Sequence, residues 1–145
     1  MPNTNGETNG VDLGESVPPR REIKHYHGYS TRVLFVVAAV LIIVAQSTGA
    51  ELPLSSAGAV IAAVVLVVAA GITNPTQGWI HWVNALLAVY GTLLFGITAV
   101  DRYRQGFSVF DASFAYIEVL ALVSLMALYF TTRTIRGFHM RATLS

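Results

Sequence analysis

Cysteine is absent from the 145 residues of this chain, and charged residues make up only 12% of it. The missing thiols exclude disulfides, cysteine nucleophiles, iron–sulfur clusters and cysteine-ligated zinc. With 54% hydrophobic residues and a mean hydropathy of +0.58, the chain carries more apolar surface than a soluble domain of this length buries. We therefore expect that surface to face a lipid bilayer, and we predict the cell membrane as its location.

Four long apolar runs follow a polar beginning. Residues 1–22 are rich in Asn, Gly, Glu, Thr and Pro and have no apolar period, which predicts a disordered cytoplasmic tail. The runs predict helices over about residues 32–50, 54–73, 79–100 and 112–132. Each is close to the ~20 residues that a helix needs to cross a bilayer.

The predicted fold class is all-α, an integral membrane four-helix bundle over residues 23–132, followed by a basic cytoplasmic tail over residues 133–145. Helices are expected because a backbone in lipid must satisfy its hydrogen bonds within its own segment. The turns agree with this division, since Pro53 separates the first two runs and Asn74-Pro75 the next two.

The orientation of the predicted bundle follows from its basic residues. Seven of the nine Lys and Arg residues fall on the side of the two termini, and Arg102 and Arg104 fall on the other side. Because cytoplasmic segments carry the excess of Lys and Arg, both termini are predicted to be cytoplasmic. The basic residues follow this topology and form no patch, and the net charge is only +1, so no nucleic-acid partner is expected.

Aromatic residues gather near the predicted ends of the runs, where amphipathic rings favour the bilayer interface. We interpret them as an interfacial belt and not as a ligand cage. They are Tyr26, Tyr29, Trp79, Trp82, Tyr103, Phe107, Phe110 and Tyr129.

Two side chains within the predicted spans can ionise, His81 in the third and Glu118 in the fourth. An acid at the centre of a membrane helix costs on the order of 2.5 kcal/mol or more, so each residue is a functional hypothesis. Consecutive helices run in opposite directions, which predicts His81 near the cytoplasmic face and Glu118 near the outer face. Glu118 is expected to be a hydrogen-bonded structural acid, with ion coupling and a site facing a partner subunit as the alternatives.

A stripe of small and polar residues predicts a packing seam along the third helix. Its members recur every three or four residues and so share one face: His81, Asn84, Ala88, Thr92 and Gly96. The second helix has a complementary small face that includes Gly58 and Ala62. We expect this face to meet the seam or another protomer.

No catalytic, cofactor or metal site is predicted, and we expect no enzyme. His25 and His27 are two residues apart, a spacing that suits neither a helical metal site nor a haem, and His139 lies in the basic tail. His81 is the one histidine in the predicted spans, whereas a bis-histidine haem needs two. The sequence shows no phosphate-binding loop and no serine nucleophile elbow.

The segment Trp79-Ile-His-Trp82-Val-Asn84-Ala-Leu-Leu-Ala-Val-Tyr-Gly91 resembles the helices of SPW-repeat membrane proteins. The likeness rests on the aromatic start, the Trp82-x-Asn84 pair and the downstream glycine. It covers one predicted helix, and the Ser-Pro-Trp triplet of that family is absent. The resemblance implies a four-helix membrane fold and no particular reaction.

Taken together, these features favour a non-enzymatic accessory or scaffold subunit, in a homo-oligomer or a larger membrane complex. Four helices enclose little volume, which favours lateral partners over a self-contained pore. One alternative is a small oligomeric ion- or proton-coupled transporter or channel that uses Glu118. A second alternative is a cofactor-bearing electron-transfer subunit.

Overall fold

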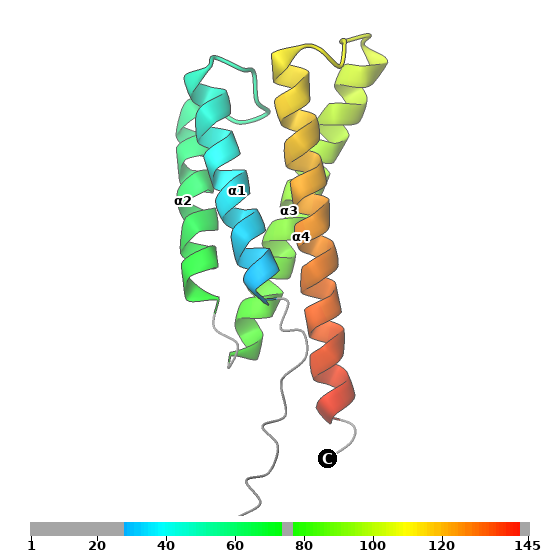
Figure 1. Cartoon of the computed structure of the whole chain (residues 1–145). Helices are drawn as coiled ribbons and strands as arrows, with labels where there is room; N and C mark the ends of the chain where they lie inside the picture. The colour runs from blue at the N-terminus through cyan, green and yellow to red at the C-terminus, as the bar shows by residue number, and fades with distance from the viewer. Residues whose placement is uncertain (1–27, 74–76, 143–145) are drawn as a thin grey trace, which may run out of the picture.

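The protein is all-helical over residues 28–73 and 77–142, the part that the structure, a computed structural model, describes. Its four helices are α1 (Gly28–Ser47), α2 (Ser56–Ile72), α3 (Gly78–Arg104) and α4 (Ala112–Ala142). They run alternately up and down (Figure 1). We call the end where α1 begins and α4 finishes the terminal end, and the end with the α1–α2 and α3–α4 connections the loop end.

Three of these helices are long and apolar enough to cross a membrane. The qualifying segments are Tyr29–Ser47, Gly78–Arg104 and Ala112–Gly137. The segment predicted as the second span forms α2, an apolar helix of 17 residues. At 1.5 Å per residue α2 covers roughly 25 Å, which makes it the shortest of the four.

The largest difference from the predicted boundaries lies at the end of α4. This helix continues to Ala142, well beyond the predicted end at residue 132, so part of the predicted basic tail is helical. The apolar run stops there, but the following Arg and Thr residues tolerate helical geometry and no proline interrupts them. The predicted disordered tail, residues 1–22, lies outside the described residues.

Both helices that end at the loop end stop in the same way. Gly49 after α1 and Gly106 after α3 have positive φ angles of 74° and 82°. At the end of α1, the amide of Ala50 donates a hydrogen bond to the carbonyl of Ala45, and the amide of Gly49 donates to the carbonyl of Gln46. The amides of Phe107 and Gly106 make the two equivalent bonds at the end of α3. This is the Schellman motif, in which a glycine in left-handed conformation lets the chain satisfy the last helical carbonyls.

The helices on the other side of each connection are capped by side chains. The hydroxyl of Ser55 accepts a hydrogen bond from the Gly58 amide at 3.1 Å at the start of α2. At the start of α4, Asp111 Oδ1 accepts from the amides of Ser113 and Phe114, at 2.8 and 3.2 Å. Such caps satisfy amides that have no partner within the helix.

The bundle is closed on three sides and open on the fourth. α1 packs against α2 and α4, and α4 packs extensively against α3, whereas α2 and α3 touch at few points. Figure 1 shows α1 and α2 side by side, with α4 in front of α3. The space between α2 and α3 therefore separates the two helical pairs.

Many of the buried side chains are alanines, although the core also contains several large residues such as Phe95 and Ile117, and many large apolar side chains lie outside it. Buried positions include Ala38, Ala59, Ala88 and Ala127, while many Val, Ile, Leu and Trp side chains are exposed. Lipid removes the hydrophobic drive between helices, so membrane helices associate through close packing of small residues. This distribution is typical of a membrane protein.

Candidate functional site

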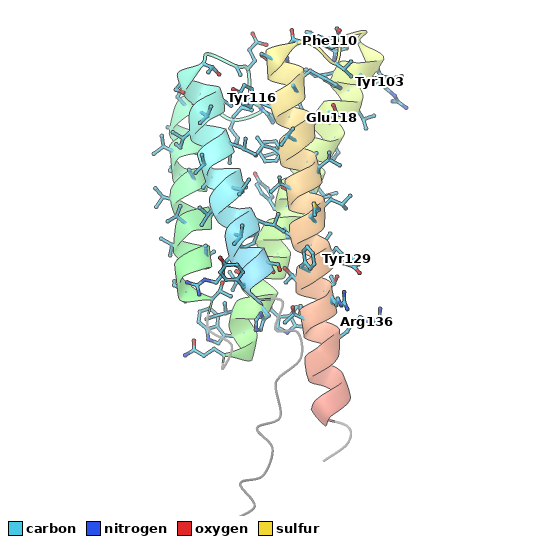
Figure 2. All side chains as sticks on the ribbon, in the orientation of Figure 1. Tyr103, Phe110, Tyr116, Glu118, Tyr129 and Arg136 are labelled. Atoms are coloured by element: carbon cyan, nitrogen blue, oxygen red, sulfur yellow. The ribbon has the colours of Figure 1, made fainter. Side chains whose placement is uncertain are left out.

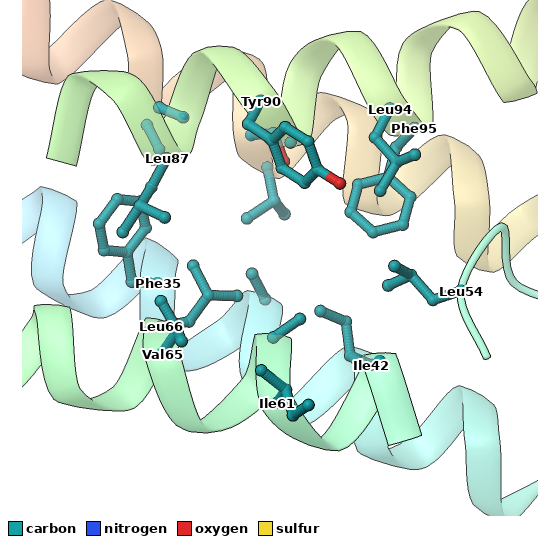
Figure 3. Close-up of a pocket in the computed structure, with 18 residues that line it drawn as sticks. Phe35, Ile42, Leu54, Ile61, Val65, Leu66, Leu87, Tyr90, Leu94 and Phe95 are labelled. Atoms are coloured by element: carbon teal, nitrogen blue, oxygen red, sulfur yellow. The ribbon is translucent and has the colours of Figure 1, made fainter. Parts of the chain in front are cut away.

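A cavity of about 340 Å³ lies where α2 and α3 diverge. All four helices contribute to its wall, and most of the lining side chains are aliphatic, among them Ile61, Val65 and Leu94 (Figure 3). A second hollow of about 270 Å³ shares Val65 and Leu87 with it and extends along the same two helices to Trp79 at the terminal end. The space between α2 and α3 is therefore an apolar hollow over most of its length.

Gly91 on α3 and Ser124 on α4 lie in close contact in the wall of this cavity. A Cβ atom added to Gly91 would lie 2.7 Å from Ser124 Oγ and 3.3 Å from Ser124 Cβ. Real side chains do not tolerate the shorter distance, so any side chain at this position would force the Ser124 hydroxyl to move. The absence of a side chain at Gly91 also leaves the Ser124 hydroxyl beside the cavity.

Tyr90, the neighbour of Gly91, stands at the opening of the cavity. Its side chain is 62% exposed and lines the space together with Ser124. Figure 3 shows the Tyr90 ring on α3 with its hydroxyl oxygen at the edge of the open space. The cavity is thus apolar except for two hydroxyl groups, and no charged side chain lines it.

A hydrogen-bonded cluster closes the C-terminal end of α2. Arg32 on α1 donates from Nε to the carbonyl of Ala70 at 2.8 Å. Thr73 donates its hydroxyl to the carbonyl of Ala69 at 2.7 Å and accepts a bond from Asn84 Nδ2 at 3.0 Å. The last carbonyls of a helix lack partners of their own. We call Arg32, Thr73 and Asn84 the α2 clamp, because they satisfy those carbonyls and tie α2 to α1 and α3.

Two of the predicted functional residues belong to this terminal end. Asn84 is buried, and its Oδ1 accepts no hydrogen bond from the described residues. His81 is buried one helical turn before it, near the start of α3. The flanking Trp79 and Trp82 are exposed, as expected for an interfacial belt.

The predicted packing residues separate into three groups. Ala88 is buried in the core, and Thr92 is half-buried with its hydroxyl bonded to Ala88 O at 2.7 Å. Gly96 has open space where a Cβ would stand, so Gly91 rather than Gly96 makes the close approach to α4. Gly58 and Ala62 line the cavity, because α2 diverges from α3 at this height.

Glu118 occupies a different environment from the one predicted. It is exposed on α4 near the loop end and is not enclosed among polar groups of the bundle (Figure 2). Arg102, at the same end of the bundle, pairs with Glu51 at 3.1 Å. It also lies 5.1 Å from the ring centroid of Phe107. The acid within the span therefore faces outward.

Sequence reasoning missed three residues that matter here: Gly91, Ser124 and Tyr90. Each is an ordinary residue of an apolar run. Only the packing of α3 against α4 brings the three residues together in the wall of one cavity. The 3.6-residue period placed Ala88 correctly but extended the seam to Gly96, where a Cβ atom would meet only open space. No group of three or more metal-ligating side chains occurs among the described residues.

No known protein family, curated protein or solved structure matches this chain. The likeness of the Trp79–Gly91 segment to SPW-repeat helices thus remains a resemblance of that segment alone. Four helices, three of them long and apolar enough to span a bilayer, indicate a membrane protein.

Proposed function

We propose that the protein is a non-enzymatic accessory or scaffold subunit of the cell membrane that works by lateral association, either with copies of itself or within a larger membrane complex. The proposal includes four crossings, of which α2 is the shortest, and two cytoplasmic termini. The seven-to-two distribution of Lys and Arg supports this orientation.

The main support for the proposal is the outward position of Glu118. Ser124 stands at the middle of the span Ala112–Gly137, and Glu118 is six residues from it. At 1.5 Å per residue the carboxyl group is about 9 Å from the midpoint, inside the hydrocarbon layer. An acid facing lipid at this depth costs on the order of 2.5 kcal/mol or more. A partner that offers a hydrogen-bond donor or a cation to Glu118 removes this cost.

The transporter alternative has less support from the interior of the bundle. Five of the six buried polar side chains among the described residues lie toward the terminal end, and the sixth, Ser124, lies at the middle of α4's span; the five are Thr31, Thr73, His81, Asn84 and Thr131. Toward the loop end the core contains Ile42, Phe95, Ile117 and Leu120. A path for ions or protons needs polar groups or water at every depth. Transport through a single protomer would therefore require a rearrangement of this apolar half.

The native mass of the full chain in a mild detergent tests the proposal. We expect a particle larger than the 15.6 kDa protomer. Glu118→Leu should release the protomer, because it removes the polar group that the partner satisfies. Val119→Leu, a change at the adjacent exposed position, is the matched control and should leave the mass unchanged.

Two results would contradict the proposal. One is a wild-type protein that remains a 15.6 kDa protomer in several mild detergents. The other is a complex whose mass and stability are the same with Glu118→Leu as without it. A visible absorption band in the purified wild type would favour the electron-transfer alternative.

A further inference from the structure

Two hydroxyl groups at the cavity between α2 and α3 differ from three threonine hydroxyls of the spans. Thr92, Thr98 and Thr131 each donate to the carbonyl four residues earlier, at 2.6–2.7 Å. Ser124 and Tyr90 line the cavity, and neither forms a hydrogen bond with any described residue. Ser124 is only 9% exposed, and it lines the cavity, so its hydroxyl is open to that space and not to bulk water. A hydroxyl removed from water without a partner costs about 1–3 kcal/mol.

Both hydroxyls lie at the middle of the membrane-spanning segments. Gly91 has thirteen residues on either side within the span Gly78–Arg104, and Ser124 has twelve before it and thirteen after it within Ala112–Gly137. Because Ser124 Oγ lies directly against Gly91, the two midpoints coincide in space. Tyr90 is therefore far from either interface, although tyrosine in membrane helices favours the interfaces. Water is scarce at this depth, so a different oxygen-bearing molecule must satisfy these hydroxyls.

We propose that the cavity binds an uncharged long-chain lipid that carries a carbonyl oxygen, and that Ser124 and Tyr90 donate hydrogen bonds to that oxygen at the middle of the bilayer. A carbonyl oxygen has two lone pairs and accepts from two hydroxyl donors. The site is independent of the proposed accessory role and does not require Glu118.

Size, charge and access each restrict the ligand. The volume of about 340 Å³ lies within the roughly 300–1,000 Å³ of small-molecule sites. No charged side chain lines the wall, so a phosphate or ammonium head group would be buried without a counter-charge. The cavity opens between α2 and α3, where they touch at few points, so the ligand enters from the bilayer. The second hollow between α2 and α3 provides room for the hydrocarbon chain of the ligand.

An ordinary phospholipid acyl chain satisfies the apolar wall but not the hydroxyls. Its ester carbonyls stay near the head group, at the interface, and its chain offers no acceptor at the midplane. The hydroxyls therefore distinguish a chain that carries a carbonyl from one that is purely hydrocarbon. This difference is the basis of the test.

Photolabelling of the full chain in detergent micelles tests the proposal. The probe is a benzophenone with an alkyl tail, whose ketone both accepts hydrogen bonds and inserts into nearby C–H bonds when irradiated. We expect saturable labelling of peptides that line the cavity, such as those containing Ile61 and Leu94. Unlabelled 2-tridecanone should compete with the probe, and tridecane, of equal chain length, should compete roughly fivefold or more weakly.

Variants then test whether the two hydroxyls bind the carbonyl oxygen of the ketone. Ser124→Ala and Tyr90→Phe should each weaken competition by 2-tridecanone roughly fivefold, which corresponds to one hydrogen bond, and should leave competition by tridecane unchanged. Thr92→Val is the matched control, because the Thr92 hydroxyl is already bonded to Ala88 O and does not line the cavity. Gel filtration and circular dichroism confirm that each variant is folded. Tyr90→Phe alters an exposed ring and keeps the test valid if Ser124→Ala does not fold.

Three outcomes would overturn the proposal. Equal competition by ketone and alkane would mean that any hydrocarbon chain fills the space. Labelling that does not saturate, or that spreads over the exposed faces of α3 and α4, would mean that no site exists. Saturable labelling that is insensitive to both hydroxyl variants would mean that the carbonyl is not recognised by Ser124 and Tyr90. The native mass of the Glu118→Leu variant bears on the accessory role alone, so the two proposals can fail separately.

Discussion

Gly91 and Ser124 meet at the middle of two helical segments long and apolar enough to span a membrane, so closely that a Cβ on Gly91 would stand 2.7 Å from the Ser124 hydroxyl oxygen. This contact sets the distance between α3 and α4, the most extensively packed pair of helices. It also directs the Ser124 hydroxyl to the cavity wall. One missing side chain therefore governs both the packing of the bundle and the polarity of the cavity.

Substitutions at Gly91 should destabilise the protein in proportion to the volume they add. Gly91→Ala forces the Ser124 hydroxyl to rotate away, and Gly91→Val also presses on the backbone of α4. We expect a loss of about 1–3 kcal/mol for Gly91→Val, typical of overpacking. Thermal unfolding in detergent measures it. Gly96→Ala is the control, because a Cβ there meets no atom within 4 Å outside its own helix.

A reciprocal exchange should restore the fit. In Gly91→Ala/Ser124→Gly the hydroxymethyl group that the new methyl group would meet is removed, so we expect the double variant to be more stable than Gly91→Ala alone. A double variant that is less stable than the sum of the two single changes would show that the contact is not the source of the strain.

The hydrogen bond between Thr73 and Asn84 should contribute a small but measurable coupling energy. A double-mutant cycle with Thr73→Val and Asn84→Leu isolates it. Side-chain hydrogen bonds between membrane helices average about 0.6 kcal/mol and reach about 1.7 kcal/mol, so we expect a value in this range. A coupling energy of zero would mean that α2 is held at its C-terminal end by Arg32 alone.

Arg32 should be more important for stability than other arginines at the same end of the bundle. Arg32→Leu leaves the carbonyl of Ala70 without its donor, and we expect a loss of about 1–2 kcal/mol in unfolding experiments. Arg133→Leu removes the same charge from an exposed position on α4 and should change stability by less than about 0.5 kcal/mol. Equal effects would show that net charge, and not the bond to α2, is what matters.

Topology reporters should show that α2 crosses the membrane despite its length. Fusions after residues 50, 73, 106 and 145 should read outside, inside, outside and inside. If the fusions at 50 and 73 report the same side, α2 lies within one leaflet or at an interface. An outside reading at residue 145 would contradict the cytoplasmic position of the C-terminus.

Glu118→Gln separates the accessory proposal from the transporter alternative. Glutamine keeps the shape of the side chain and its ability to hydrogen-bond a partner, so assembly should survive the change. In reconstituted vesicles under a pH gradient, neither wild type nor variant should carry protons. Proton flux in wild type that disappears in Glu118→Gln would instead favour a coupled transporter.

The helices themselves could be predicted from the sequence, because length and apolar composition suffice in lipid. The predicted runs coincide with the four helices to within a few residues, apart from the C-terminal end of α4. The predicted burial of Ala88 also agrees with the structure. These features depend on local chain properties and on the 3.6-residue period.

The candidate site could not be predicted in the same way, since it depends on how the helices cross. Both glycines suit a small-residue seam, but Gly91 and Gly96 point in different directions, and the rotation of α3 about its axis decides which of them faces α4. The exposure of Glu118 likewise follows from the rotation of α4 about its own axis. A polar residue in an apolar run predicts that a partner is needed, but not whether that partner is inside the bundle or outside it.

On the proposed four-crossing topology, the shortness of α2 sets the thickness of the bilayer beside it. A hydrophobic segment shorter than the surrounding hydrocarbon can draw the leaflets together, while the 27-residue α3 beside it requires no such thinning. The hollow between these helices would then open where the membrane changes thickness. Lipid chains are least regularly packed at such a step, so a molecule leaving the bilayer for the cavity would give up fewer favourable contacts there than on any other side of the protein.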